Sequence, residues 1–113
     1  MANAKLRQTL EAGGMVVAPA VFDAITARLM RHLGFNALSV PGSGAGVVLC
    51  TTQEMTTLTE MAMLGETVAK GVQDELPVIV DAGAGFGEPV HVAHAVQVFE
   101  AAGVTAIHIE DQA

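Results

Sequence analysis

The chain has 113 residues, 51% of them hydrophobic and 15% charged, which is the length and apolar content of one folded domain and excludes a disordered chain. Its formal net charge of −7, with only five lysines and arginines, argues against nucleic acid and against an anionic membrane surface as partners. The single cysteine, Cys50, and the lack of an apolar run of roughly 18 residues predict a cytoplasmic protein without an internal disulfide or a membrane span.

The predicted elements alternate between helix and strand along the whole chain. In order, the pattern predicts a helix over residues 3–12, a strand over 15–18, a helix over 22–33, a strand over 35–40, a loop over 41–46, a helix over 57–72, a strand over 77–80, a helix over 89–102 and a strand over 104–109. Thr57 and Glu60 form a capping-box pattern, and Pro89 stands where a first helical turn tolerates proline. Strands joined by single helices run parallel, so the sequence predicts an α/β protein with four parallel strands.

Acids and glycines follow three consecutive predicted strands. Asp81 ends the third strand and Glu110 follows the fourth, whereas Gly42 and Ser43 lie in the loop after the second. In parallel α/β folds, ligands bind at the carboxyl ends of the strands. We therefore expect Asp81 and Glu110 to hold Mg²⁺, and the backbone N–H groups of Gly42 and Ser43 to bind the carboxylate of a substrate.

The same residue types also have other uses. Acids at strand ends serve as helix caps and loop anchors, and the two GxGxG patterns of the chain lack the spacing of the GxGxxG dinucleotide fingerprint. His91 and His94 flank the apolar stripe of a predicted helix, which is typical of a solvated pair. His108 fits a hydrogen-bonded interior histidine as well as a catalytic one.

Four stretches of the sequence carry a resemblance to a known family: APAVFDAITARLMRHLGFNALSV, TLTEM, LPVIVDAGAGFG and VFEAAGVTAIHIEDQ. In order and spacing they resemble the isocitrate lyase and phosphoenolpyruvate mutase superfamily, which includes methylisocitrate lyases. The resemblance implies the N-terminal half of a (β/α)₈ TIM barrel. Residues 1–113 would form a single partial domain with the first four βα units, without the helix that follows the fourth strand.

The resemblance also implies a chemistry and assigns residues to it. It implies Mg²⁺ or Mn²⁺, and cleavage of a carbon–carbon bond in a small 2-hydroxy or 2-oxo di- or tricarboxylate through a pyruvate-type enolate. Asp81 matches the first acid of the superfamily's DAD metal motif, and Glu110 matches a later acid. Gly42 and Ser43 match the loop that binds the substrate's carboxylate, and Asp81 also faces the substrate.

The sequence departs from the family pattern at several places, two of which are positions where the family has acids. Gly83 stands where the second acid of the DAD motif is expected, and Thr52 falls roughly where another acid belongs. The loop that supplies the general acid or base would follow Gln112, so no catalytic residue is predicted. A phosphoenolpyruvate mutase or phosphonate-type enzyme, and a catalytically silent half-barrel, are therefore alternatives. Because a half-barrel exposes strand edges, we expect a homo-oligomer or pairing with a C-terminal half.

Overall fold

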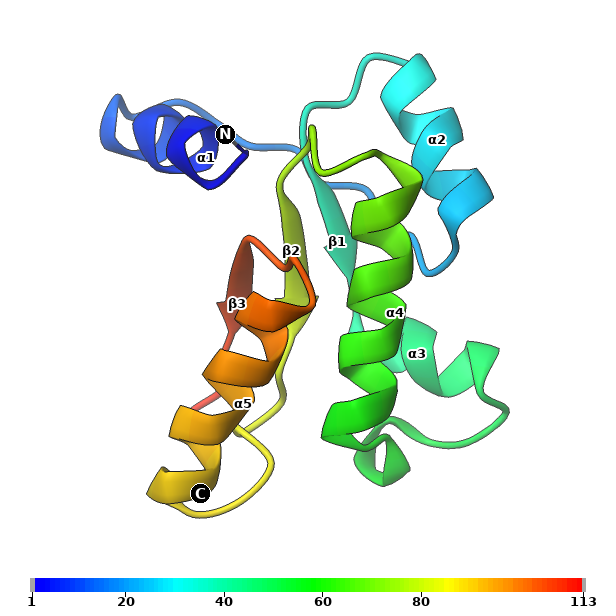
Figure 1. Cartoon of the computed structure of the whole chain (residues 1–113), viewed down its shortest axis with the longest axis vertical. Helices are drawn as coiled ribbons and strands as arrows, with labels where there is room; N and C mark the ends of the chain where they lie inside the picture. The colour runs from blue at the N-terminus through cyan, green and yellow to red at the C-terminus, as the bar shows by residue number, and fades with distance from the viewer. Residues whose placement is uncertain (1, 113) are drawn as a thin grey trace.

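A small parallel sheet forms the centre of the molecule, and helices lie along it (Figure 1). The computed structural model describes residues 2–112. The three strands are all parallel and lie in the order β1-β2-β3. The elements are, in chain order, α1 (Ala2–Glu11), α2 (Ala24–His32), β1 (Leu38–Val40), α3 (Gly42–Val48), the 3₁₀ helix η1 (Gln53–Met55), α4 (Leu58–Gly71), β2 (Val78–Asp81), α5 (Pro89–Ala101) and β3 (Ala106–His108). Within the described range, no helix is long and apolar enough to cross a membrane.

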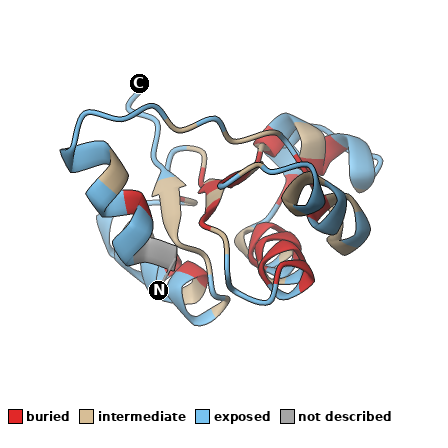
Figure 2. Ribbon diagram, turned by 90° about the horizontal axis from the view of Figure 1, so that it is seen from above, coloured by how far each residue is buried: buried red, intermediate tan, exposed pale blue. Residues whose placement is uncertain are grey.

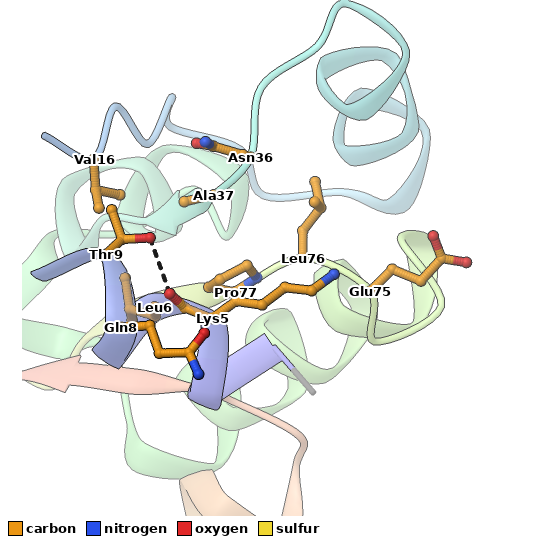
Figure 3. Close-up of a pocket in the computed structure, with 10 residues that line it drawn as sticks. All are labelled: Lys5, Leu6, Gln8, Thr9, Val16, Asn36, Ala37, Glu75, Leu76 and Pro77. Atoms are coloured by element: carbon orange, nitrogen blue, oxygen red, sulfur yellow. Dashed lines mark hydrogen bonds between the residues drawn. The ribbon is translucent and has the colours of Figure 1, made fainter. Parts of the chain in front are cut away.

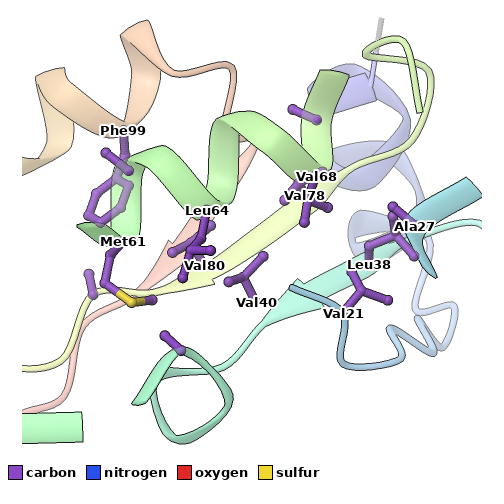
Figure 4. Packing of buried hydrophobic residues seen from close by; sticks show 14 of the residues in the cluster. Val21, Ala27, Leu38, Val40, Met61, Leu64, Val68, Val78, Val80 and Phe99 are labelled. Atoms are coloured by element: carbon purple, nitrogen blue, oxygen red, sulfur yellow. The ribbon is translucent and has the colours of Figure 1, made fainter. Parts of the chain in front are cut away.

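The hydrophobic core lies between the sheet and α4. Successive side chains of a strand point to opposite faces, and Leu38, Val40, Val78 and Val80 are fully buried on the face that contacts α4. Figure 4 shows Val80 packed against Leu64 of α4. Helices α2 and α5 flank α4. Figure 2 shows that buried residues gather on α4 and the strands, whereas most of α5 is exposed.

The opposite face of the sheet carries both polar and apolar residues. Ser39, Ile79 and Ala106 lie on it and are half-buried. Asp81 and His108 are register partners on β2 and β3, and they continue the same face at the carboxyl ends of the strands. The alternation therefore directs apolar side chains to the core and brings one acid and one histidine to the far side of the sheet.

The strand predicted over residues 15–18 is wrong, so the described residues contain three strands and not four. Its place beside β1 is taken by a single parallel bridge between Ala20 and Ser39. The bridge consists of the Val21 N–H donating to the Ser39 carbonyl at 2.8 Å and the Ser39 N–H donating to the Pro19 carbonyl at 3.0 Å. A strand requires a ladder with its neighbour, and only these residues reach β1.

The loop predicted over residues 41–46 is also wrong, because this segment forms the start of α3. Glycine disfavours a helix interior, but here it allows close packing. A Cβ atom at Gly46 would lie 3.1 Å from the Thr51 carbonyl oxygen, and one at Gly44 would lie 2.6 Å from the ring of Phe22. The approach of α3 to its neighbours thus overrides the low helix propensity of its sequence.

The local signals at helix ends are confirmed. Thr57 caps α4, its side chain accepting the Glu60 N–H at 3.2 Å while the Glu60 carboxylate accepts the Thr57 N–H at 2.8 Å. Pro89 is the first residue of α5. Gly34 and Gly103, which follow α2 and α5, have positive φ angles of 94° and 83°, the conformation in which glycine commonly ends a helix.

Candidate functional site

Asp81 lies at the carboxyl end of β2 with both carboxylate oxygens bonded to backbone. Oδ2 accepts the N–H of Gly42 at 3.2 Å, and Oδ1 accepts the N–H of Gly83 at 2.8 Å. The first donor begins α3, after the neighbouring strand β1, and the second belongs to the loop that follows β2. The half-buried carboxylate is therefore held in place by two different segments, and each oxygen retains room for a further partner.

A small hollow of about 40 Å³ opens beside the Asp81 carboxylate. It is lined by Gly42, Gln53, Thr56, Met61, Asp81, Gly83 and Phe86. This volume exceeds the roughly 30 Å³ that one water molecule occupies in the liquid. The hollow therefore has room for one water or one small ion, and a carboxylate substrate would have to lie above it.

Gln53 and Thr56 are members of this site that the sequence did not reveal. A Cβ atom at Gly42 would lie 3.0 Å from Asp81 Oδ2 and 3.0 Å from Gln53 Nε2, so the carboxamide and the carboxylate border the same small space. Thr56 is buried, and its hydroxyl donates to the Thr52 carbonyl at 3.3 Å. Thr52, the residue expected near a missing acid, does not line the hollow. No sequence signal marks Gln53, because its proximity to Asp81 depends on how α3 and η1 pack together.

Gly42 and Ser43 form the first turn of α3. The buried Gly42 is bonded to Asp81 through its N–H, whereas Ser43 is exposed. The structure brings Gly42 next to Asp81, but it engages the Gly42 N–H within the protein. Binding of a substrate carboxylate by these two residues stays a prediction.

Glu110 lies beyond the end of β3 and is exposed. Its N–H donates to the Gly83 carbonyl at 2.8 Å, which extends the pairing of the two strands by one step. Its carboxylate accepts a hydrogen bond from Gln112 Nε2 at 2.6 Å. Glu110 therefore stands next to the Asp81 loop through its backbone, but its side chain does not line the hollow.

The loop after Asp81 carries a strained residue. Phe86 has a φ of 66°, a left-handed conformation that is rare for a bulky side chain. Its ring lies 6.2 Å from that of the buried Phe99, with 46° between the ring planes. This aromatic contact anchors the loop to α5 while the same side chain closes one wall of the hollow.

The histidines take different positions. His91 Nδ1 accepts the Glu88 N–H at 3.0 Å at the start of α5, and His91 and His94 are both exposed, as predicted for a solvated pair. His108 is exposed beside Asp81 in the neighbouring strand. Among these three, only His108 stands next to the candidate site.

The donor set at Asp81 consists of groups that a hard cation prefers. Its polar side chains are a carboxylate, a carboxamide and a hydroxyl, from Asp81, Gln53 and Thr56. Over residues 2–112, no three histidines, cysteines or acids cluster in a way that could hold a metal ion. Mg²⁺ prefers oxygen ligands, keeps several waters and commonly uses only one or two protein carboxylates. The residues therefore fit Mg²⁺ if a ligand or water completes its coordination.

A larger hollow of about 300 Å³ lies at the opposite end of the sheet, beneath α1 (Figure 3). Leu6, Ala37 and Pro77 form its buried floor, and Lys5 and Glu75 lie at its rim. Glu75 is already paired with Arg31 of α2. This hollow borders the amino ends of β1 and β2, away from the strand ends where ligands of parallel folds bind.

Known proteins share this sequence and fold. A sequence model of the family described as phosphoenolpyruvate phosphomutase matches residues 6–113. The chain belongs to the phosphoenolpyruvate mutase and isocitrate lyase superfamily. Within this superfamily, a 2-methylisocitrate lyase from Aeropyrum pernix is 40% identical over 108 residues, and a 2,3-dimethylmalate lyase from Eubacterium barkeri is 38% identical over 109 residues.

Solved structures of superfamily members agree with the fold. A crystal structure of 2,3-dimethylmalate lyase has a TM-score of 0.89 at 35% identity, covering 97% of this chain and 39% of that protein. A phosphonopyruvate hydrolase in complex with oxalate and Mg²⁺ has a TM-score of 0.87 at 29% identity, covering 100% of this chain and 40% of that protein. The alignments with the two lyases above include 95% and 96% of this chain, but only 34% and 38% of the lyases' own lengths. The chain thus corresponds to the N-terminal portion of a TIM-barrel enzyme.

Proposed function

We propose that this chain provides the Asp81 half of the active site of a Mg²⁺- or Mn²⁺-dependent carbon–carbon lyase. Its substrate would be a small 2-hydroxy or 2-oxo di- or tricarboxylate. The observation that carries the proposal is the Asp81 carboxylate, fixed by two backbone N–H groups beside a hollow lined by oxygen-bearing side chains. The lyases among its relatives, and the relative bound to oxalate and Mg²⁺, support the same assignment.

Each residue has a defined part in this proposal. Asp81 and Glu110 would hold the divalent ion, and Gln53 and Thr56 would orient water molecules near it. The ion, when bound, acts as a Lewis acid that stabilises the negative charge of an enolate. Ser43, in the exposed first turn of α3 next to Gly42, binds the substrate's carboxylate with its backbone N–H. No general acid or base is assigned within residues 2–112.

Two other functions are consistent with the same site. A mutase or hydrolase of phosphonates would use the same oxygen donors, and one superfamily structure is a phosphoenolpyruvate phosphomutase from Streptomyces platensis, at 30% identity and a TM-score of 0.85. A catalytically silent half-barrel is favoured by Gly83, which leaves Asp81 as the only carboxylate among the described residues that line the hollow. A measurement of ligand binding distinguishes a silent half-barrel from the two kinds of enzyme.

Calorimetric titration tests the proposal directly. Oxalate, a mimic of the pyruvate enolate, is titrated into the chain with and without Mg²⁺, and then into Asp81→Asn and Glu54→Gln. We expect Mg²⁺-dependent binding that weakens at least tenfold in Asp81→Asn and is unchanged in Glu54→Gln, which removes an exposed acid outside the hollow. An oxalate affinity that is unchanged in Asp81→Asn would contradict the proposed site. The absence of any oxalate binding would support a silent half-barrel.

A gain of function provides the complementary test. A Cβ atom at Gly83 would meet no other atom within 4 Å, and the φ of 52° at this position is one that aspartate tolerates better than most residues. Gly83→Asp adds a carboxylate beside Asp81, so we expect tighter Mg²⁺ binding than in the parent chain. Gly83→Asn provides the neutral control of the same shape. Equal Mg²⁺ affinities of the two variants would argue against a cation at this place.

A further inference from the structure

The hollow of about 300 Å³ beneath α1 is built from segments that are far apart in the sequence (Figure 3). One wall comes from α1, another from Val16, and the rest from the residues that lead into β1 and β2. Ligand pockets have volumes of about 300 Å³ and more, so this space suits a small molecule. The hollow beside Asp81 lies at the carboxyl ends of the same strands, so the two spaces are separate.

The floor of this hollow is apolar and held in place by the sheet. Its members Leu6, Ala37 and Pro77 are buried, and the half-buried Leu76 packs against the core. Ala37 directly precedes β1 and Pro77 directly precedes β2, and the Leu38 N–H donates to the Pro77 carbonyl at 2.9 Å. A floor that is ordered before binding receives a hydrocarbon group at little cost in entropy.

The rim of the hollow favours an anion, although the chain has a formal net charge of −7. Lys5 extends across the hollow toward Glu75 (Figure 3), but within residues 2–112 its ammonium forms no ion pair. Glu75 is paired with Arg31 instead, so these two charges compensate each other and that of Lys5 remains. Gln8 and Asn36 also line the hollow, and their carboxamides can donate hydrogen bonds to an anion.

Helix α1 is attached to the sheet by few contacts. Over residues 4–11, Leu6 is its only buried side chain, and Leu10 on the same stripe is 58% exposed. Gly13, just after the helix, has a φ of 73°, a conformation that glycine adopts readily. Elements with few buried apolar contacts open at a low cost in free energy. Because the hollow lies between α1 and the sheet, a ligand inside it contacts both and opposes this opening.

We propose that this hollow binds a small carboxylate with a branched apolar body, and that the bound ligand fixes α1 against the amino ends of β1 and β2. The apolar body lies on the floor formed by Leu6, Ala37 and Pro77, and the carboxylate pairs with the ammonium of Lys5. The site requires no metal ion. It is independent of the function proposed for Asp81, which lies at the other end of the strands.

Calorimetric titration with isovalerate, in the absence of Mg²⁺, tests the ligand class. Lys5→Met removes the charge but keeps the length of the side chain, and it should weaken binding at least fivefold. Arg7→Met makes the same change in charge on α1 outside the hollow and should alter the affinity less than twofold, as should Asp81→Asn. Isovaleramide, an uncharged ligand of the same shape, should bind the parent chain at least fivefold more weakly than isovalerate. Equal isovalerate affinities of the parent and Lys5→Met would overturn the proposal.

Limited digestion with trypsin tests the effect on α1. Trypsin cleaves after lysine and arginine, and Arg7 is exposed on α1. A saturating concentration of isovalerate should slow cleavage after Arg7 at least threefold. Cleavage after Arg28, which lies on α2 and does not line the hollow, should keep its rate. The absence of isovalerate binding to the parent chain, or binding that leaves the rate at Arg7 unchanged, would each overturn the proposal.

Discussion

The two acids expected to share one site are held in very different ways. Asp81 is half-buried, and its two oxygens accept N–H groups from Gly42 and Gly83, one from each side of the strand end. Glu110 is exposed, and within residues 2–112 its carboxylate accepts only from Gln112, two residues away. Both follow parallel strands at the same end of the sheet, so position in the fold alone does not organise a carboxylate.

The difference arises from the segments that follow β1 and β2. Helix α3 begins two residues after Val40 and brings the Gly42 N–H to Asp81, and the loop after β2 turns back so that Gly83 donates as well. Nothing in the described part of the chain returns to Glu110 in this way. A preorganised carboxylate needs no further ordering to receive a ligand, whereas a free one has to be ordered by it. Asp81 is therefore the anchor of the site.

The largest effect on stability should follow loss of the Asp81 carboxylate. Asp81→Ala removes the acceptor of two backbone N–H groups in a half-buried place, and we expect the free energy of unfolding to fall by about 2 kcal/mol. Asp81→Asn retains one carbonyl oxygen and should lose about half as much. Urea denaturation at neutral pH measures both. A loss below about 0.5 kcal/mol is the ordinary range for a surface change. Such a result would mean that Asp81 contributes no more to stability than the exposed Glu110.

A methyl group at Gly42 should have the next largest effect. Its Cβ would lie 3.0 Å from both Asp81 Oδ2 and the Gln53 carboxamide, and we expect Gly42→Ala to destabilise the chain by about 1.5 kcal/mol through overpacking. Ser43→Ala, at the exposed neighbouring position, should have little effect. Combining Gly42→Ala with Gln53→Ala should recover part of the loss, because the two residues share one space. Additive losses would show that Gln53 does not border Gly42.

The sequence predicted those features that depend on neighbours in the chain. The capping box at Thr57, the helix start at Pro89 and the acid at the end of β2 each follow from a few adjacent residues. The strand over residues 15–18 and the loop over 41–46 failed because their states depend on distant partners: a ladder with β1 in one case, and close backbone packing in the other. Gln53 was missed for the same reason, since it reaches Asp81 only through the packing of α3 and η1.

Asp23 provides an intermediate case, an acid held by backbone but outside the site. It caps α2, and its pKa is lowered from 3.8, mainly because its carboxylate accepts the Thr26 backbone N–H and, in addition, the Thr26 hydroxyl. Asp23→Ala should destabilise the chain by about 1 kcal/mol at neutral pH.

The sign of the Asp23 pKa shift fixes the pH dependence of this loss. Because the folded-state pKa is the lower one, the contribution of the charged carboxylate is complete above pH about 4 and disappears as the pH falls through the folded-state pKa. Unfolding free energies of the parent and Asp23→Ala should therefore converge in acid. Asp23→Asn keeps a capping oxygen without a titrating proton, so its stability should lack this particular pH dependence. Parallel curves for parent and Asp23→Ala would exclude the carboxylate as the cause.

The smallest effect should come from Glu110, and it sharpens the comparison most. In the free chain, Glu110→Gln alters an exposed carboxylate that accepts no backbone N–H among the described residues, so the free energy of unfolding should change by less than about 0.5 kcal/mol. With Mg²⁺ and oxalate present, the same variant should lower the thermal stabilisation that the ligands provide, since a carboxylate near the ion contributes only once the ion is there. A Glu110 that is silent in both conditions would leave Asp81 as the single acid of the site, whereas a large loss in the free chain would mean that Glu110 is organised before any ligand arrives.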